Sequence, residues 1–177
     1  VLESSIRSHD GLLFKHAGDG VCAAFSSARA ALSAAIEAQQ QLQLPVRMGL
    51  ATGEAEHRNR DYFGPTLNRA ARIMAAGHGG QILLAESTAA LVRIDQLIDL
   101  GFHRLRDLAG SEGLFQACDD HLPTEFPTLR TLNATPGNLP GAVTNLVGRE
   151  DQLAELANTV RARRLVTLTG MGGVGKT

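Results

Sequence analysis

The chain has 177 residues, of which 44% are hydrophobic and 20% are charged, as is ordinary for a globular protein. Its 17 lysines and arginines nearly balance its 18 aspartates and glutamates, so the composition excludes a generic electrostatic binder of nucleic acids or membranes. Cys22 and Cys118 are far apart in the sequence, which excludes a disulfide-stapled scaffold and fits a reducing cytoplasm. No apolar run approaches the ~18 residues that cross a bilayer, so we expect a cytoplasmic protein.

Prolines mark a division of the chain. Four of the six fall within residues 123–140, together with threonine, asparagine and glycine. This composition predicts a linker over residues 119–147, between a first domain at residues 1–118 and a short segment at residues 148–177. Because the chain starts at Val1 and ends at Thr177 within a glycine-rich stretch, we expect a piece of a longer protein.

The first domain alternates short apolar runs with helical patterns. Residues 1–9 are expected to end a helix, and Gly11–Phe14 and Val21–Phe25 to form a hairpin through Ala-Gly-Asp-Gly. A helix capped by Ser26 or Ser27 should run to Leu44, before Pro45. Further elements are expected as follows: strand Val46–Thr52, loop His57–Asp61, helix Gly64–Ala76, strand Gln81–Ala85, short helix Glu86–Leu91, and closing strands Leu97–Gly101, Arg104–Leu108 and Gly113–Cys118. The pattern predicts an α/β (α+β) domain with adjacent antiparallel strands and packed helices.

The final segment carries a second pattern. Gly148–Val160 has apolar residues at helical spacing, and Leu165–Thr169 is a β-rich apolar run. The run leads into Gly170-x4-Gly175-Lys176-Thr177, which fits the Walker A pattern in full. In such a loop backbone N–H groups wrap a phosphate, the lysine reaches the outer phosphates, and the threonine holds Mg²⁺. The alternative is a glycine-rich turn, and without the following helix we do not expect this piece itself to bind ATP there.

The stretch from Val147-Gly148-Arg149-Glu150 to Thr177 resembles the opening of a STAND-type P-loop ATPase. The resemblance implies that the parent is a bacterial multi-domain transcriptional regulator. Any contact with nucleic acid would then be made by domains absent from this chain.

Polar residues gather in two places in the first domain. Lys15 precedes Asp19 by four positions, and a carboxylate at a hairpin tip beside glycines suits a divalent metal bound to phosphate oxygens. Alternatively, Asp19 forms the turn and Lys15 is a solvated strand charge. On the helix expected from Gly64, Asn68 and Arg72 share one face, and Asp61 precedes it. The alternative there is surface polarity, which is what we expect for Arg69.

Taken together, Lys15-x3-Asp19 and Asp61-x2-Gly64-x3-Asn68-x3-Arg72 resemble the catalytic domain of class III nucleotidyl cyclases over Gly11–Ala117. The resemblance implies a ferredoxin-like cyclase homology domain with a mainly antiparallel sheet. It also implies conversion of ATP to 3′,5′-cyclic AMP and pyrophosphate.

Roles follow from the resemblance residue by residue. Asp19 matches the second of two metal-binding aspartates, and Lys15 and Asp61 match the pair that reads the base and favours adenine. Asn68 matches the residue that orients the ribose, and Arg72 the one that stabilises charge in the transition state. The resemblance implies two Mg²⁺ or Mn²⁺ ions per site and a homodimer. One subunit supplies the metal aspartates and the other the remaining four residues.

The family's first metal aspartate lies on an opening strand that this sequence does not contain. We therefore expect little or no cyclase activity from this piece alone. A lapsed cyclase-fold module, which binds nucleotide or dimerises to regulate the attached ATPase, is the alternative to an enzyme. All five positions carry the family's residue, which favours the enzyme. A third hypothesis, an ATP-driven transcription switch with the cyclase domain as accessory, is compatible with both.

Overall fold

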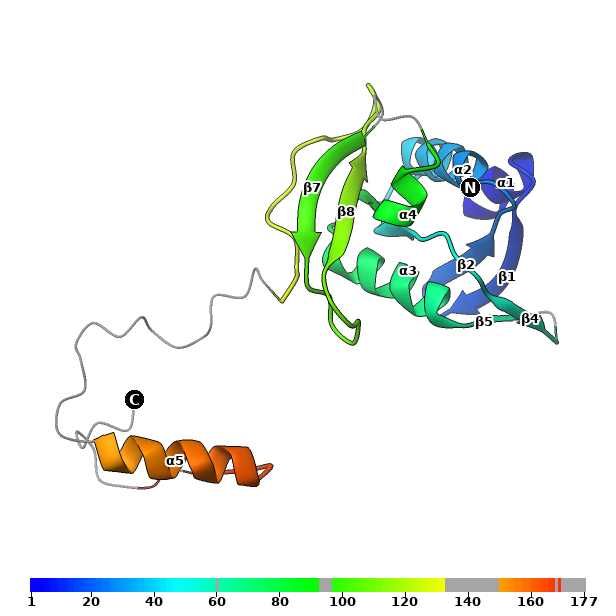
Figure 1. Ribbon diagram of the computed structural model, residues 1–177. Coiled ribbons are helices and arrows are strands. Elements are labelled where there is room, and N and C mark those ends of the chain that lie inside the picture. The colour runs from blue at the N-terminus through cyan, green and yellow to red at the C-terminus, as the bar shows by residue number, and fades with distance from the viewer. Residues whose placement is uncertain (60, 93–96, 133–149, 168, 170–177) are drawn as a thin grey trace. The chain divides into compact units, whose positions relative to one another are not determined.

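The computed structural model describes residues 1–59, 61–92, 97–132, 150–167 and 169 (Figure 1). The chain forms two compact units, Val1–Pro136 and Gly137–Thr177, and each is considered by itself. The described helices and strands of the first unit are α1 (Leu2–Ser8), β1 (Leu12–Ala17), β2 (Gly20–Ala24), α2 (Ala28–Gln41), β3 (Met48–Leu50), β4 (Glu56–Arg58), β5 (Asp61–Phe63), α3 (Pro65–Ala76), β6 (Ile82–Ala85), α4 (Glu86–Ala89), β7 (Leu97–His103) and β8 (Glu112–Ala117).

The principal sheet has the strand order β3-β6-β8-β7. Its β3–β6 pair is parallel, whereas the β6–β8 and β7–β8 pairs are antiparallel. Strands β1 and β2 form a separate antiparallel hairpin, and so do β4 and β5. Antiparallel pairing therefore predominates in the described strands, which confirms the predicted α+β domain.

Strand β6 organises the core, because all four of its residues are buried. Successive side chains of a strand point to opposite faces of the sheet. Leu83 accordingly joins a cluster that contains Ile73 of α3, whereas Leu84 joins a cluster that contains Leu32 of α2. The sheet thus buries one face against α3 and the other against α2.

Helix α3 lies close against the sheet at Gly49 of β3. A Cβ atom added there would lie 2.6 Å from the carbonyl oxygen of Ala70 and 2.6 Å from the backbone nitrogen of Met74. Real side chains do not tolerate such distances, so a glycine is required for this helix to rest on this strand. The contact matters because α3 carries two of the expected site residues.

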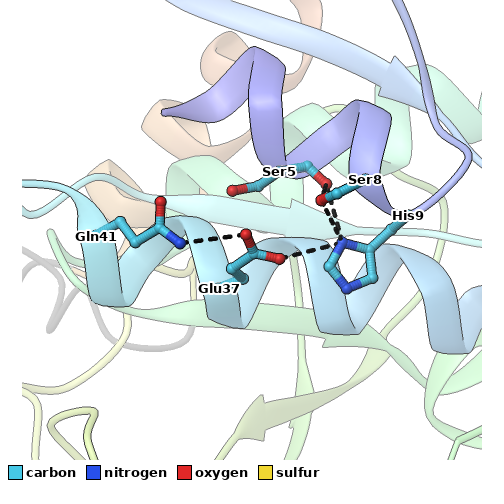
Figure 2. A network of polar contacts seen from close by, with 5 residues as sticks. All are labelled: Ser5, Ser8, His9, Glu37 and Gln41. Atoms are coloured by element: carbon cyan, nitrogen blue, oxygen red, sulfur yellow. Dashed lines mark hydrogen bonds and ion pairs between the residues drawn. The ribbon is translucent and has the colours of Figure 1, made fainter.

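A polar network joins α1 to α2 (Figure 2). The Nδ1 atom of His9 lies 3.0 Å from the carbonyl oxygen of Ser5, 3.2 Å from the hydroxyl of Ser8 and 3.4 Å from the Glu37 carboxylate. Glu37 also accepts a hydrogen bond of 3.2 Å from the side-chain amide of Gln41. These contacts hold the first helix against the second.

The predicted hairpin and helix cap are both confirmed. Gly18 and Asp19 form the two-residue turn between β1 and β2, with Gly18 at φ 63°. A positive φ at the first central residue suits the strand twist of a tight hairpin and favours glycine. Ser27 is the N-cap of α2, and its hydroxyl accepts a hydrogen bond from the backbone N–H of Ala30.

The predicted loop at His57–Asp61 is wrong, because this segment contributes to the β4–β5 hairpin. Its side chains are polar and mostly exposed, so no apolar alternation marked it as strand. The pairing places His57 opposite Tyr62, with ring centroids 4.8 Å apart. Cross-strand contacts of this kind stabilise a hairpin that the local pattern does not predict.

The predicted strand at Arg104–Leu108 is also wrong. The segment is an irregular turn after β7, with Asp107 in the left-handed region at φ 59°. Leu105 is buried in the core and Leu108 packs against the same cluster, so both side chains point to the same side of the segment. In a strand these residues, an odd number of positions apart, would face opposite sides.

In the second unit α5 spans Glu150–Ala162, which confirms the predicted helix. The strand predicted at Leu165–Thr169 is not formed in residues 165–167, and Leu165 is 85% exposed. A strand needs a neighbour for its backbone hydrogen bonds, and the described part of this unit offers none. The Walker A residues Gly170, Gly175, Lys176 and Thr177 lie outside the described residues.

The first half of the expected linker packs on the first unit. Leu129 is buried in the core, and the backbone N–H of Arg130 donates to the carbonyl oxygen of Ala76 at the end of α3. The side-chain amide of Gln116 donates to the carbonyl oxygen of Thr124 at 2.8 Å. Residues 119–132 thus run along the domain surface and cover the end of α3. The division into domains stays a prediction.

Candidate active site

A β-bulge near the start of β1 directly precedes Lys15, the first of the site residues. The register between β1 and β2 shifts between Leu13 and Lys15, so that Phe14 has no partner of its own. Bulges turn side chains away from their regular direction. The ring of Phe14 meets Tyr62 of β5 edge-on, with centroids 4.9 Å apart. This contact brings β1 beside β5.

Lys15 and Asp61 form a direct polar contact between these two strands. The Nζ atom of Lys15 donates a hydrogen bond of 2.8 Å to Oδ2 of Asp61, and the side chains are 47% and 24% exposed. The other carboxylate oxygen accepts from the backbone N–H of Tyr62 at 2.8 Å. The hydrogen bond raises the pKa of Lys15 and lowers the pKa of Asp61, so both groups are charged at neutral pH. The pair therefore presents a cationic donor beside an anionic acceptor.

Helix α3 begins immediately after β5 and positions the next two residues. Gly64, at φ 131°, is the N-cap, and Pro65 follows as the first helical residue. The hydroxyl of Thr66 donates to the carbonyl oxygen of Glu54 at 2.6 Å, which ties the helix start to the loop before β4. Asn68 and Arg72 then stand on successive turns of one face, as the spacing predicts.

Arg72 is held by a residue outside the predicted set. Its Nη2 atom lies 2.7 Å from Oδ2 of Asp107, in the turn between β7 and β8. Its Nε atom is buried without a hydrogen-bond partner in the described structure. Arg69, expected to be ordinary surface polarity, pairs with Glu112 at 3.3 Å. Both arginines of α3 thus pair with carboxylates, one in the turn between β7 and β8 and the other at the start of β8.

Asp19 lies at the tip of the β1–β2 hairpin. It is exposed, and among the described residues it makes no ion pair with the other four. Its carboxylate fits as one oxygen ligand of a divalent ion that is also held by substrate phosphates. The described residues gather no cluster of three or more His, Cys, Asp or Glu side chains. Asp19 alone therefore does not complete a metal site within the described chain.

The structure brings Lys15 and Asp61 together and sets Asn68 and Arg72 on one helix face. Sequence reasoning missed Asp107. The turn-forming run Asp-Leu-Ala-Gly at residues 107–110 was a sign of irregular backbone there, but no spacing links Asp107 to Arg72. Ion pairs between distant segments are decided by packing.

Comparisons with known proteins identify the family. A family model for the adenylate and guanylate cyclase catalytic domain matches residues 14–107. The uncharacterized protein Rv0891c of Mycobacterium tuberculosis is 37% identical over 163 residues, which cover 86% of this chain. The chain belongs to the adenylate and guanylate cyclase catalytic-domain family. It spans 57% of the length of this mycobacterial relative.

Solved structures agree with this assignment. The adenylate/guanylate cyclase/hydrolase from Silicibacter pomeroyi matches with a TM-score of 0.62 and 27% identity, over 68% of this chain and 79% of that one. Adenylate cyclase from Trypanosoma brucei in its monomeric state has the same fold, with a TM-score of 0.63 and 21% identity over 73% and 78% of the chains.

None of the helices in the described part of the chain has the length and apolar composition needed to span a bilayer.

Proposed function

We propose that this domain, within the intact parent protein, converts ATP to 3′,5′-cyclic AMP and pyrophosphate. The observation that carries the proposal is the hydrogen bond between Lys15 and Asp61. An ammonium group has three donors and a carboxylate only acceptors, so the pair keeps capacity for a base. Adenine offers a ring-nitrogen acceptor beside an amino donor, which complements a lysine beside an aspartate. Guanine offers the reverse order, so the pair favours ATP over GTP.

Helix α3 would handle the sugar and the phosphates. Asn68 would orient the ribose so that its 3′-oxygen faces the α-phosphorus. That oxygen gives its proton to water and forms the new bond to phosphorus, while the bond to the pyrophosphate oxygen breaks. Arg72 would stabilise the negative charge that develops, since a guanidinium can meet two phosphate oxygens. Such a reaction depends mainly on positioning and electrostatics.

Asp19 would hold Mg²⁺ or Mn²⁺, of which we propose two for each site. When bound, such ions neutralise phosphate charge and favour ionisation of the attacking hydroxyl. The proposed active form is a homodimer. In it, Asp19 of one protomer contributes to the site that Lys15, Asp61, Asn68 and Arg72 form in its partner.

The remainder of the parent is a proposal on sequence pattern. We propose that residues 148–177 begin a P-loop ATPase of a cytoplasmic regulator, to which the cyclase domain is attached through the proline-rich linker. The phosphate-binding residues Gly170, Gly175, Lys176 and Thr177 support this from the sequence alone.

The test is cyclic AMP formation by the purified full-length protein with ATP and Mn²⁺. Asp19→Ala and Arg72→Ala should each lower turnover by about 100-fold or more. Equal activity in all three proteins would sink the catalytic assignment. ATP binding without turnover would favour the alternative, a nucleotide-binding or dimerisation module that has lost catalysis.

A further inference from the structure

Two ion pairs tie α3 to the turn between β7 and β8 and to the start of β8. Arg72 pairs with Asp107 of the turn at 2.7 Å, and Arg69 pairs with Glu112, the first residue of β8, at 3.3 Å. The two pairs join the same kinds of group and use the same helix. Only Arg72, however, belongs to the proposed site. The pairs therefore form a natural comparison between a site arginine and its neighbour.

The guanidinium of Arg72 is held at one of its atoms. Nη2 pairs with Asp107, while Nε is buried without a hydrogen-bond partner in the described structure. A buried, unpaired N–H costs free energy, and an arginine side chain free to move would turn this group to water. The ion pair to Asp107 opposes that rotation. It therefore keeps the side chain in an orientation that it would not adopt alone.

The turn that carries Asp107 is itself anchored. Leu105 is buried and Leu108 packs on the core cluster that contains Ile73 of α3. Asp107 projects between these two anchors with φ 59°, a conformation that aspartate tolerates better than most residues. The carboxylate is thus presented to α3 by a turn whose two leucines pack on the core.

We propose that Asp107 is a positioning residue, which holds the guanidinium of Arg72 in place for the charge that develops on the substrate phosphate. This inference rests on the proposed cyclase function. A cation that acts on a transition state must be placed before the reaction, because an error of about 1 Å costs about 100-fold in rate. The loss of Asp107 should consequently lower kcat and leave KM nearly unchanged.

Two substitutions at Asp107 separate the carboxylate from the turn. Asp107→Gly removes the carboxylate and keeps a residue suited to positive φ, whereas Asp107→Asn keeps both that conformation and an acceptor oxygen. Glu112→Gln is the matched control, because it weakens the neighbouring pair between Arg69 and the start of β8. In the full-length protein with ATP and Mn²⁺, Asp107→Gly should lower kcat about tenfold with KM changed less than about twofold. Asp107→Asn should retain about a third of kcat or more, and Glu112→Gln should resemble the wild type.

A double-mutant cycle decides whether the effect runs through Arg72. In an Arg72→Ala background Asp107→Gly should cause no further loss. A further tenfold loss there, wild-type kcat in Asp107→Gly, or an equal loss in Glu112→Gln would each overturn the inference.

A readout independent of turnover is the ¹⁵N–¹H NMR signal of the Arg72 Nε group. It should shift or broaden in Asp107→Gly and stay unchanged in Glu112→Gln. An unchanged signal in Asp107→Gly would show that Asp107 does not hold Arg72. If the wild type itself makes no cyclic nucleotide, the proposed function fails and positioning for catalysis fails with it. Wild-type activity lost in Arg72→Ala but kept in Asp107→Gly would overturn only the role of Asp107.

Discussion

The ring of Phe14 meets that of Tyr62 edge-on at 4.9 Å, directly beside the hydrogen bond between Lys15 and Asp61. The apolar contact and the polar contact involve adjacent residues of the same two strands, β1 and β5. The Phe14–Tyr62 contact therefore holds the β1–β2 hairpin beside the β4–β5 hairpin next to Lys15 and Asp61, the pair proposed to read the base.

Tyr62→Ala should loosen that pair. Edge-to-face ring contacts contribute about 0.5–1.5 kcal/mol, so we expect a modest fall in Tm and a KM for ATP raised severalfold. Phe63→Ala is the control, because Phe63 is the next residue of β5 and instead lies under Arg58. Thermal unfolding and ATP titration of both variants check this. A KM that rises equally in the two variants would contradict a special role for the Phe14–Tyr62 contact.

Lys15→Glu should change the preference between bases. A carboxylate in place of the ammonium repels Asp61 and can accept from guanine, but it cannot donate to adenine. We expect kcat/KM for ATP to fall about 100-fold and the ratio of GTP to ATP use to rise. His16→Glu introduces the same carboxylate one position along β1, where side chains point to the other face, and should keep the ATP preference. An unchanged ratio in Lys15→Glu would remove the base-reading assignment.

The Lys15–Asp61 pair should make stability depend on pH in a defined direction. The pKa of Asp61 is lowered from its ordinary 3.8, so its contribution is present above that value and is lost as pH falls through the lower folded-state value. The pKa of Lys15 is raised from 10.5, so its contribution is present below that value and is lost as pH rises through the higher one. Both contributions to stability are therefore present at neutral pH.

Lys15→Met should accordingly lower Tm at about pH 7 by a small amount, as for other exposed ion pairs, and not at about pH 2. In an Asp61→Asn background, the effect of Lys15→Met on Tm should no longer depend on pH. Scanning calorimetry at the two pH values measures the difference, and a Tm gap that persists in acid would show that the effect comes from packing.

Gly49→Ala should destabilise the domain by about 1–3 kcal/mol, because its Cβ would collide with the backbone of α3 at Ala70 and Met74. Gly113→Ala is the comparison, since the nearest atoms there are Cβ and Oε2 of Glu86 at 3.2 Å, a contact that a shift of a few tenths of an ångström relieves. Denaturant unfolding should show the larger loss at Gly49. Equal losses would mean that α3 can shift away from β3.

The sequence predicted those elements whose cause is local. The Gly18–Asp19 turn, the Ser27 cap and the start of α3 after Gly64 each depend on a few adjacent residues with definite backbone preferences. The set of polar residues in the first domain likewise pointed to the cyclase family, which the comparisons confirm. Their individual roles stay predictions.

Local sequence patterns did not predict the features that depend on a partner far away in the sequence. The β4–β5 hairpin is polar and was not predicted. The turn at residues 104–108 buries a leucine, and its alternating pattern led to the wrong prediction of a strand. The links between Lys15 and Asp61 and between Arg72 and Asp107 join segments far apart in the sequence. Backbone preferences act over a few residues, whereas ion pairs and ring contacts form only after the sheet and α3 have packed. The sequence by itself therefore determined which residues could make a site, and the tertiary structure decided which of them meet.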